Sequence, residues 1–353
     1  MTKQSLKEQQ NNSRIQMAFA SFRGHRISMM AFWVLVVLYS MAIFADFICP
    51  YSYQDEDRNF SYCPPTAVEL LGHGHLVRPF VYKRTLTFNS IHRRIYIIDQ
   101  SQVYPLRFFK HGRLITVDQP GRLYIWGADA RGRDIFSRIW YGARISLSIG
   151  LLGVAISFIL GLAIGGIAGY YGGWVDGALM RLCEMFMMVP GFYLMLALRA
   201  AVPENFNSVQ VYLSVVVILA LIGWASLARI IRGMTLSLRE RDYVLAAKTL
   251  GVPDIVIIFK HILPQTISFS CATLMLTISS YILAEAGLSV VGLGIQDPVP
   301  SWGNLLSDAM GIVPIIFAPW ILTPGLFIFI TVMSFNLVGD GLRDAFDPML
   351  RDL

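Results

Sequence analysis

The chain has 353 residues, of which 55% are hydrophobic and 15% charged, and its mean hydropathy is +0.55. A soluble domain of this length carries more charge and fewer apolar residues, so the composition predicts a membrane protein. The formal net charge of +6 does not indicate a nucleic-acid partner, because Lys and Arg accumulate in the cytoplasmic loops of membrane proteins.

Six stretches of the chain are long and apolar enough for a membrane-spanning helix, which needs about 20 residues. We therefore expect an all-α polytopic membrane protein with about six transmembrane helices and both termini on one side. The third stretch contains Pro190 and Gly191, so we expect a break there. The six stretches are Met30–Ile48, Ile145–Ala168, Glu184–Ala200, Val209–Ala228, Thr266–Leu293 and Ile312–Val338.

Both ends of the chain are expected in the cytoplasm. Residues 1–29 form a polar tail that is too long for a cleavable signal, and residues 30–48 form the first transmembrane helix. This tail and the segment after the fourth span are rich in Lys and Arg, which is typical of cytoplasmic segments. Residues 341–353 form a C-terminal tail on the same side.

Residues 49–143 form an extracytoplasmic region that we expect to be partly β. Apolar and polar residues alternate in Ile91–Asp99, Val103–Phe109 and Arg113–Val117, and the segments HGR and QPGR supply turns. The alternation predicts a small β-rich insertion between the first and second transmembrane helices.

The same region contains two cysteines and a pair of histidines. Cys49 and Cys63 either form a disulfide in an oxidising compartment or remain unpaired as structural cysteines. His73 and His75 have no nearby third ligand, so we expect loop residues rather than a metal site.

A charged segment precedes the second span. It contains Arg131, Arg133, Asp134 and Arg138 within eight residues. These residues either dock a protein partner or cap the helix, because an acidic residue near a helix start interacts favourably with the helix dipole.

The other five spans lie in residues 144–340. In the second span, Gly161, Gly165 and Gly169 recur every four residues and line one helix face with small residues. Such a face lets another helix approach closely.

The cytoplasmic loop 229–265, between the fourth and fifth spans, is patterned as a helix, a sharp turn and a second helix. Within Asp242–Pro264, Gly251 is expected in the left-handed conformation that ends a helix. Pro253 suits the first turn of the next helix, and Pro264 is expected to end that helix before the fifth span.

Ala246 and Ala247 in this loop present almost no side chain, so another protein surface could approach the helix closely. Amphipathic loops also lie on membrane surfaces. Surface binding, however, does not require Ala-Ala, Gly and Leu-Pro at fixed spacing, which favours a protein contact.

Polar or flexible side chains in two spans are candidates for a translocation pathway. Glu285 is costly in lipid and is therefore expected to face the bundle interior, where it contacts substrate, latches a gate or pairs with an arginine. Met187 and Met188 either line a tolerant pathway, since methionine adapts to varied surfaces, or serve helix packing.

The segment Asp242–Pro264 resembles the cytoplasmic coupling loop of permease subunits of bacterial ABC importers. The signature of that loop is Glu-Ala-Ala, three residues, Gly, nine residues, Ile, one residue, Leu-Pro. Leu245 replaces the glutamate and His261 replaces the isoleucine, so the salt bridge of that glutamate is not expected. The matching positions are held by Ala246, Ala247, Gly251, Leu263 and Pro264.

These departures are similar to the dipeptide and oligopeptide importer branch, and four further segments agree with it. Ala128 stands where that branch usually has threonine, and region 49–143 is larger than the branch usually shows. The four segments are GADARGRDIFSRIWYGARISLSIG (127–150), GYYGGWVD (169–176), GLSVVGLGIQDPVPSWGNLL (287–306) and GDGLRDAFDP (339–348).

The resemblance implies the type I permease fold of ABC importers in a bacterial inner membrane. It also implies a heterodimer with a second homologous permease, two cytoplasmic ATPases that bind ATP and Mg, and an extracytoplasmic binding protein. The charged segment is then a docking candidate for the binding protein or the second permease. The coupling residues implied are Asp242, Tyr243, Ala246, Ala247, Gly251, His261, Leu263 and Pro264.

The residues agree that ATP is hydrolysed by a partner. None of the six lysines follows a glycine, so the chain lacks the phosphate-binding pattern GxxxxGK[ST] and is not expected to be an enzyme or to hold a cofactor. Neither HExxH nor GxSxG occurs, which disfavours an intramembrane protease. An ion-coupled transporter would favour inverted repeats or acidic residues at mid-span. Peptides are the expected substrates, with nickel complexes or sugars as alternatives.

Overall fold

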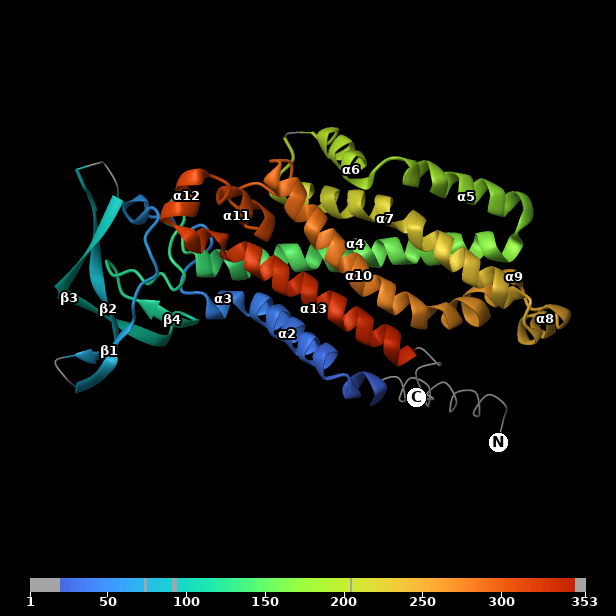
Figure 1. Cartoon of the computed structure of the whole chain (residues 1–353), viewed down its shortest axis with the longest axis horizontal. Coiled ribbons are helices and arrows are strands. Elements are labelled where there is room, and N and C mark those ends of the chain that lie inside the picture. The colour runs from blue at the N-terminus through green and yellow to red at the C-terminus, as the bar shows by residue number, and fades with distance from the viewer. Residues whose placement is uncertain (1–19, 73–74, 91–93, 204, 347–353) are drawn as a thin grey trace. The chain divides into compact units, whose positions relative to one another are not determined.

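The computed structural model describes residues 20–346 except 73–74, 91–93 and 204 (Figure 1). Within these residues, five helices are long and apolar enough to cross a membrane, and a bent pair of helices brings the total to six if it forms one span. The structure is mainly helical with one small antiparallel sheet, so the predicted fold class is confirmed. The five are Arg26–Ile43, Ile135–Tyr171, Ser208–Arg239, Phe269–Val290 and Pro319–Phe346.

The bent pair corresponds to the third predicted span. Its two helices are Gly173–Met188 (α5) and Gly191–Ala200 (α6), which meet at 85°. The predicted break at Pro190 is confirmed, because Pro190 leaves the helical conformation and caps α6. The span starts earlier than Glu184, since Gly172 has a φ of +66° and reverses the chain directly after the second span.

The remaining elements follow in chain order. Before the sheet come α2 (Arg26–Ile43), α3 (Ala45–Ile48) and η1 (Arg58–Phe60). After it come α4 (Ile135–Tyr171), α5, α6, α7 (Ser208–Arg239), α8 (Asp242–Thr249), α9 (Asp254–Val256), the π-helical η2 (Ile257–Ile262), α10 (Leu263–Val290), α11 (Trp302–Asp308), α12 (Ile312–Phe317), η3 (Pro319–Leu322) and α13 (Thr323–Phe346).

The chain divides into two compact units. The α8 unit comprises the described parts of Met1–Val36, Ile149–Ala284 and Ile330–Leu353. The sheet unit comprises the described parts of Val37–Ser148 and Glu285–Phe329.

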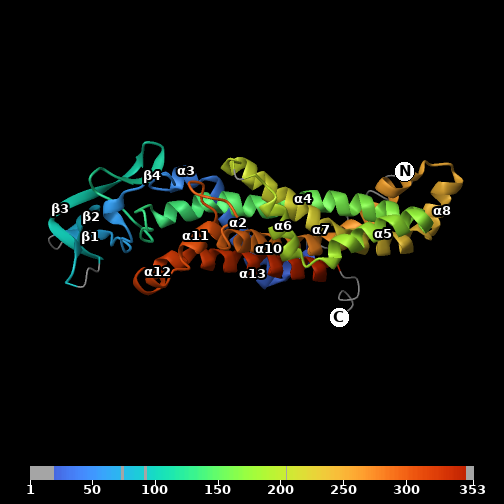
Figure 2. The ribbon, with the colours of Figure 1, turned by 90° about the horizontal axis from the view of Figure 1, so that it is seen from above.

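In the sheet unit, the four strands β1 (Glu69–Gly72), β2 (His75–Phe88), β3 (Arg94–Lys110) and β4 (Arg113–Val117) form an antiparallel meander in the order β1-β2-β3-β4. The predicted β-rich insertion is confirmed. In both Figure 1 and Figure 2, β4 lies beside α3, and the two elements are in contact.

Two of the alternating stretches belong to one strand. β3 contains the described part of Ile91–Asp99 and all of Val103–Phe109, and it continues through the polar residues between them as a bulge opposite Tyr82 and Lys83 of β2. The amide and hydroxyl of Ser101 both donate to the Asp99 carboxylate, at 3.0 and 2.6 Å, which satisfies polar groups that the bulge removes from the ladder.

In the α8 unit, the glycine face of α4 packs against α7. A Cβ on Gly165 would lie 2.4 Å from the carbonyl oxygen of Ala228, and one on Gly169 would lie 2.7 Å from that of Arg232. Both separations are far below van der Waals contact, so the helices can approach this closely only where α4 lacks side chains. The predicted close approach along Gly161, Gly165 and Gly169 is confirmed, and its partner is α7.

Candidate functional sites

The segment that connects α8 to α9 is a glycine-terminated helix end. Gly251 has a φ of +74°, its amide donates to the carbonyl of Lys248 at 3.0 Å, and the amide of Val252 donates to the carbonyl of Ala247 at 3.1 Å. This pair of bonds is the Schellman motif, which satisfies the last carbonyls of a helix and reverses the chain. The predicted helix, turn and helix is therefore confirmed.

The two alanines of α8 lie on different faces of the helix. Ala247 and Val244 are buried against Ile257 and Ile262, while Ala246 and Leu245 are exposed. The expectation that both alanines admit an approaching protein is therefore wrong for Ala247, because a helix places neighbouring residues about 100° apart. Only Ala246 lies where a partner could contact it.

Exposed apolar residues lie near Ala246 in the sequence, on α8 and on the two helical segments that follow it. We call Leu245, Ala246, Leu250, Ile255 and Phe259 the α8 surface. Leu250 is the most exposed of the large ones, at 82%. Exposed large apolar side chains that gather on one face mark protein or membrane contacts.

The expected end of the second helix at Pro264 is wrong. The chain is helical from Asp254 to Val290 without interruption, and Pro264 is the second residue of α10. The π-helical turn of η2 precedes it and widens the helix, which accommodates a residue that has no amide hydrogen and a bulky ring. Pro264 is exposed, whereas Leu263 is buried against α7 and His261 is half-buried.

Polar contacts tie the loop to the membrane helices of its unit. Arg239 donates to the carbonyl of Gly169 at 3.2 Å, at the end of α4, and Tyr170 donates to the carboxylate of Asp254 at 2.6 Å. Arg232 of α7 forms a two-point ion pair with Asp176 of α5. Buried apolar contacts and these bonds therefore hold the loop against the end of α4 and against α7, and hold α7 against α5. Asp242 lies exposed in the first turn of α8, and Tyr243 packs on the buried side.

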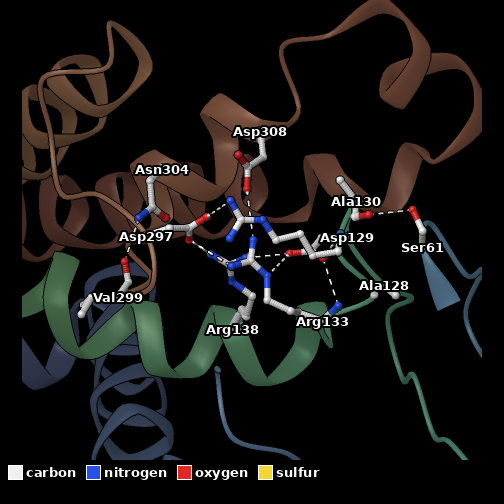
Figure 3. A network of polar contacts seen from close by, with 12 residues as sticks. Ser61, Ala128, Asp129, Ala130, Arg133, Arg138, Asp297, Val299, Asn304 and Asp308 are labelled. Carbon is white, nitrogen blue, oxygen red and sulfur yellow. Dashed lines mark hydrogen bonds and ion pairs between the residues drawn. The ribbon is translucent and has the colours of Figure 1, made fainter. Parts of the chain in front are cut away.

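In the sheet unit, the charged segment before α4 forms an ion-pair network (Figure 3). The guanidinium of Arg138 donates to Asp129 at 2.6 Å and to Asp297 at 2.8 Å. That of Arg133 donates to the same two carboxylates, at 2.7 and 3.1 Å. Arg133, which precedes α4, and Arg138, in the first turn of α4, thus join this segment to the loop after α10.

The network decides which arginines are available to a partner. The side chains of Arg133 and Arg138 are 5% and 1% exposed, whereas that of Arg131 is 51% exposed and lies 3.6 Å from Asp297. Buried ion pairs of this geometry serve to hold segments together. Arg131 is therefore the arginine of this segment that remains open to docking.

Asp134 acts as the cap of α4. Its carboxylate accepts from the amide and the hydroxyl of Ser137, at 2.8 and 2.6 Å. Burial raises the pKa of Asp134 to about 7, although the bonds from Ser137 oppose the rise. In contrast, despite burial, the charges of Arg138 and Arg133 hold the pKa of Asp297 below its ordinary value.

Glu285 is fully buried, as expected for a residue that faces the bundle interior, but its partners are not arginines. The hydroxyls of Ser146 and Ser289 donate to its carboxylate at 3.1 and 2.9 Å, and that of Ser301 also bonds to it. The expected arginine pairing is wrong, because three serine hydroxyls satisfy the carboxylate locally. Glu285 touches no solvent in this conformation.

The other sequence candidates are not drawn together. Met187 and Met188 are exposed on α5, and the sulfur of Met187 accepts from Arg229 at 3.7 Å. Cys49 and Cys63 are buried free thiols, so the disulfide alternative is wrong. His73 and the side chain of His75 lie outside the described residues. Among the residues that are described, no cluster of three His, Cys, Asp or Glu could hold a metal.

Sequence reasoning missed the acidic half of the network. Asp129 and Asp297 were not singled out, although both lie in segments that resemble the importer branch. Asp297 lies 159 positions from Arg138, so no local spacing links them. The signal that pointed to them was the presence of an aspartate in GADARGRD and in GIQDPVP, each beside a tight turn.

The chain is similar to permease proteins of named transport systems. The oligopeptide transport system permease protein of Bacillus subtilis (strain 168) is 39% identical over 240 residues, which are 67% of this chain and 76% of the relative. The glutathione transport system permease protein of Pectobacterium atrosepticum is 39% identical over 69% of this chain and 78% of the relative. A solved structure of the MetNI methionine ABC transporter, in an inward-facing conformation, covers 59% of this chain and 96% of its own at 16% identity and a TM-score of 0.46.

Two family models match the chain. The N-terminal transmembrane domain of oligopeptide transport permease C matches residues 13–65, which include α2 and α3. The binding-protein-dependent transport system inner membrane component matches residues 161–352, which include the loop from α8 to α10. The chain therefore belongs to the family of binding-protein-dependent transport system inner membrane components, the permease subunits of ABC importers.

Proposed function

We propose that this chain is one of two permease subunits of an ATP-driven importer that moves peptides across the bacterial inner membrane. The observation that carries the proposal is the α8 surface. It is apolar, exposed and tied to α4, α5 and α7, as a docking element for a motor protein must be. Membership of a family that depends on a binding protein supports the same reading.

The proposed mechanism divides the work between subunits. ATP and Mg are bound by two cytoplasmic ATPases, and closure of the ATPase pair moves α8 through its exposed apolar face. The Schellman turn at Gly251 keeps α8 at a fixed angle to α9 and η2, so the motion is passed to the membrane helices instead of being absorbed by the loop. The helices then alternate between inward-open and outward-open arrangements.

The proposed orientation places the α8 loop and both termini in the cytoplasm. Lys and Arg are concentrated in the polar N-terminal tail and in 229–265. The β-sheet then lies outside, where the binding protein delivers its cargo. We propose Arg131 as a contact for that protein or for the second permease, because its guanidinium is half-exposed while those of Arg133 and Arg138 are buried.

Glu285, Met187 and Met188 are proposed as residues of the pathway or its gate. Glu285 is enclosed by serine hydroxyls, which fits a closed gate, and the two methionines are exposed on α5 for contact with a second subunit or the cargo. Opening would have to separate Ser146 on α4 from Glu285 on α10. Such a separation exposes the carboxylate only in the transporting state.

Peptides are proposed as cargo because the two relatives described above are named for oligopeptide and glutathione transport. Nickel complexes and sugars are the alternatives within the same architecture. Isothermal titration of the cognate binding protein with a dipeptide, a longer peptide, a nickel complex and a sugar decides between them. We expect heat of binding only from a peptide.

The energy source is tested in membrane vesicles that contain the whole transport system, with binding protein and radiolabelled peptide outside. We expect uptake when ATP is present inside and a protonophore has collapsed the ion gradients. Uptake in ATP-depleted vesicles with an imposed ion gradient would instead support a secondary transporter. Vesicles that carry a Gly251→Val chain, at equal permease abundance, serve as the control for coupling through α8.

A further inference from the structure

The last residues of β3 include an exposed aromatic side chain beside α3, which follows the first membrane helix. Phe109 is 73% exposed, and its ring centroid lies 6.1 Å from that of Phe47 in α3. Figure 1 and Figure 2 show β4 beside α3, which follows directly on α2. The end of β3 and the start of β4, which we call the β3–β4 tip, thus lie beside the segment that follows the last residue of α2.

Polar contacts around α3 mark that level. Arg144 donates to the carbonyl of Ile43, the last residue of α2, at 2.8 Å and to the carboxylate of Asp46 at 2.7 Å. Tyr141 donates to the same carboxylate at 2.8 Å. An exposed ion pair with a tyrosine beside it is typical of the headgroup layer and costly in hydrocarbon. These contacts favour a headgroup level at α3, which carries Phe47 and packs against the Phe109 ring.

The apolar side of α2 continues onto this tip. Ile43, Phe44 and Phe47 are exposed at the end of the helix, and the Phe109 ring extends their row onto the sheet. On a membrane-spanning helix such side chains face lipid. Since Phe109 is continuous with them, the surface that covers α2 also covers Phe109.

A basic groove opens beside Phe109. It has a volume of about 760 Å³, and its lining includes Arg78, Arg107 and Lys110 together with Phe108 and Phe109. Arg107 and Lys110 both contact the carboxylate of Asp118, at 2.6 Å, so one acidic group serves two cations.

The positive charge is not confined to the groove. The sequence from Thr66 to Pro120 carries eight Lys or Arg against three Asp or Glu. Cations next to exposed aromatic rings at the interface are the combination that binds anionic lipid headgroups.

We propose that the β3–β4 tip is a membrane anchor. Phe109 inserts among the headgroups of the leaflet on the Ile48 side of α2, and the groove lined by Arg78, Arg107 and Lys110 binds the phosphate of an anionic phospholipid. The anchor fixes the sheet against the membrane surface. It requires only that α2 spans the membrane, so it stands or falls independently of the cargo and the energy source.

Insertion of Phe109 is tested on the full-length chain in lipid nanodiscs. A single NBD fluorophore is attached at Phe109→Cys in a Cys271→Ser background, because the other three cysteines are buried. The matched control is Phe88→Cys, which is also exposed but pairs with Arg94 at the opposite end of β3. A second probe at Phe108→Cys covers the case that Phe109→Cys fails to fold.

Spin-labelled lipids then report how close the NBD fluorophore lies to the bilayer, because the spin label quenches its emission. We expect them to reduce the emission at the tip at least twofold and to leave the emission at Phe88→Cys unchanged. Equal quenching at the tip and at the control overturns the proposal. Shielding of the tip from aqueous iodide by added binding protein, without quenching by lipid, assigns the surface to a protein and also overturns it.

The charge half of the proposal is tested by native mass spectrometry of lipid bound to the chain from nanodiscs of equal phosphatidylglycerol and phosphatidylcholine content. The variant Arg78→Glu/Lys110→Glu is expected to lose phosphatidylglycerol preference by roughly fivefold for each cation removed. The control Lys83→Glu/Arg94→Glu changes the net charge by the same amount, in the part of β2 and β3 away from the groove, and is expected to keep the phosphatidylglycerol preference. Equal lipid selectivity in the two variants contradicts binding of the lipid phosphate in the groove.

Discussion

The amide of Val252 donates to the carbonyl of Ala247 at 3.1 Å, across a Gly251 that has a φ of +74°. This bond closes the end of α8 and, through Ala247, joins the turn to the buried core of the loop. The turn therefore couples the backbone conformation of one glycine to the direction of the helix that carries the α8 surface.

Gly251→Val is expected to uncouple ATP hydrolysis from peptide uptake. No heavy atom lies within 4 Å of a Cβ built at Gly251, so the cost arises from the left-handed backbone, about 1–2 kcal/mol for a residue other than glycine. Gly251→Asn adopts this conformation more readily and is expected to keep most uptake. The check is peptide uptake per ATP hydrolysed at equal membrane abundance.

Gly233→Ala is the matched control for this pair. Gly233 lies near the C-terminal end of α7, with ordinary helical backbone and open space at its Cβ position. Alanine there is expected to leave coupling unchanged. Equal uptake per ATP for Gly251→Val and Gly233→Ala would show that the turn has no part in coupling.

Ala247→Leu is expected to lower the stability of the loop, whereas Ala246→Leu is expected to weaken binding of the ATPase. Ala247 is buried, so added methyl groups overpack the core of the loop and cost about 1–3 kcal/mol of folding free energy. Ala246 is exposed, so Ala246→Leu should leave the melting temperature unchanged and weaken co-purification of the ATPase. Thermal unfolding and pull-down of both variants make the comparison. The reverse pattern would place the contact face on the Ala247 side.

Arg138→Met is expected to lower the melting temperature of the purified chain strongly. It leaves the buried Asp129 and the half-buried Asp297 with fewer partners, and removal of one member of a buried pair costs about 3–5 kcal/mol. Arg131→Met removes an exposed partner of the same Asp297 and is expected to cost less than about 1 kcal/mol. Tryptophan fluorescence reports both, because Trp126, Trp140 and Trp302 pack in the same unit. Similar losses for the two variants would argue against the network as a structural clamp.

Asp134 is expected to make the stability of the fold fall as pH rises from about 4 to about 7. Below its usual pKa of 3.8, the carboxyl is protonated in both the folded and the unfolded state. Between 3.8 and about 7, only the folded state holds the proton, and above about 7 neither state does. Folding therefore takes up a proton in this window, and stability decreases with pH. Asp134→Asn keeps an acceptor for Ser137 and removes the titration. The difference in melting temperature between variant and wild type should grow from pH 4 to pH 7; a constant difference contradicts the raised pKa.

The spans and the turn at Gly251 were predictable because their causes are local. Hydropathy depends on the residues of the span itself, and the left-handed turn depends on a residue without a Cβ. The same applies to the break at Pro190. The predicted helix end at Pro264 was wrong, because whether a proline ends a helix depends on the turn before it. That turn, η2, is π-helical, which its sequence does not indicate.

The partners of the charged side chains were not predictable in the same way. Asp297 meets Arg138 only after the segments before α4 and after α10 have folded together, and Ser146 meets Glu285 for the same reason. The inward side of α8 also depends on the position of η2, which decides that Ala247 is buried and Ala246 exposed. Long-range contacts of this kind leave no spacing in the sequence.

Photo-cross-linking from Ala246 tests the central claim most directly. A benzoylphenylalanine is placed at Ala246 in the complete transporter, and a second chain carries it at the exposed Met188 of α5 as a control. We predict a product between the Ala246 position and an ATPase subunit, stronger with ATP present, and no ATPase product from the Met188 position. Cross-linking of the Ala246 position to lipid alone, while the ATPases remain bound to the complex, would show that α8 is not the ATPase contact.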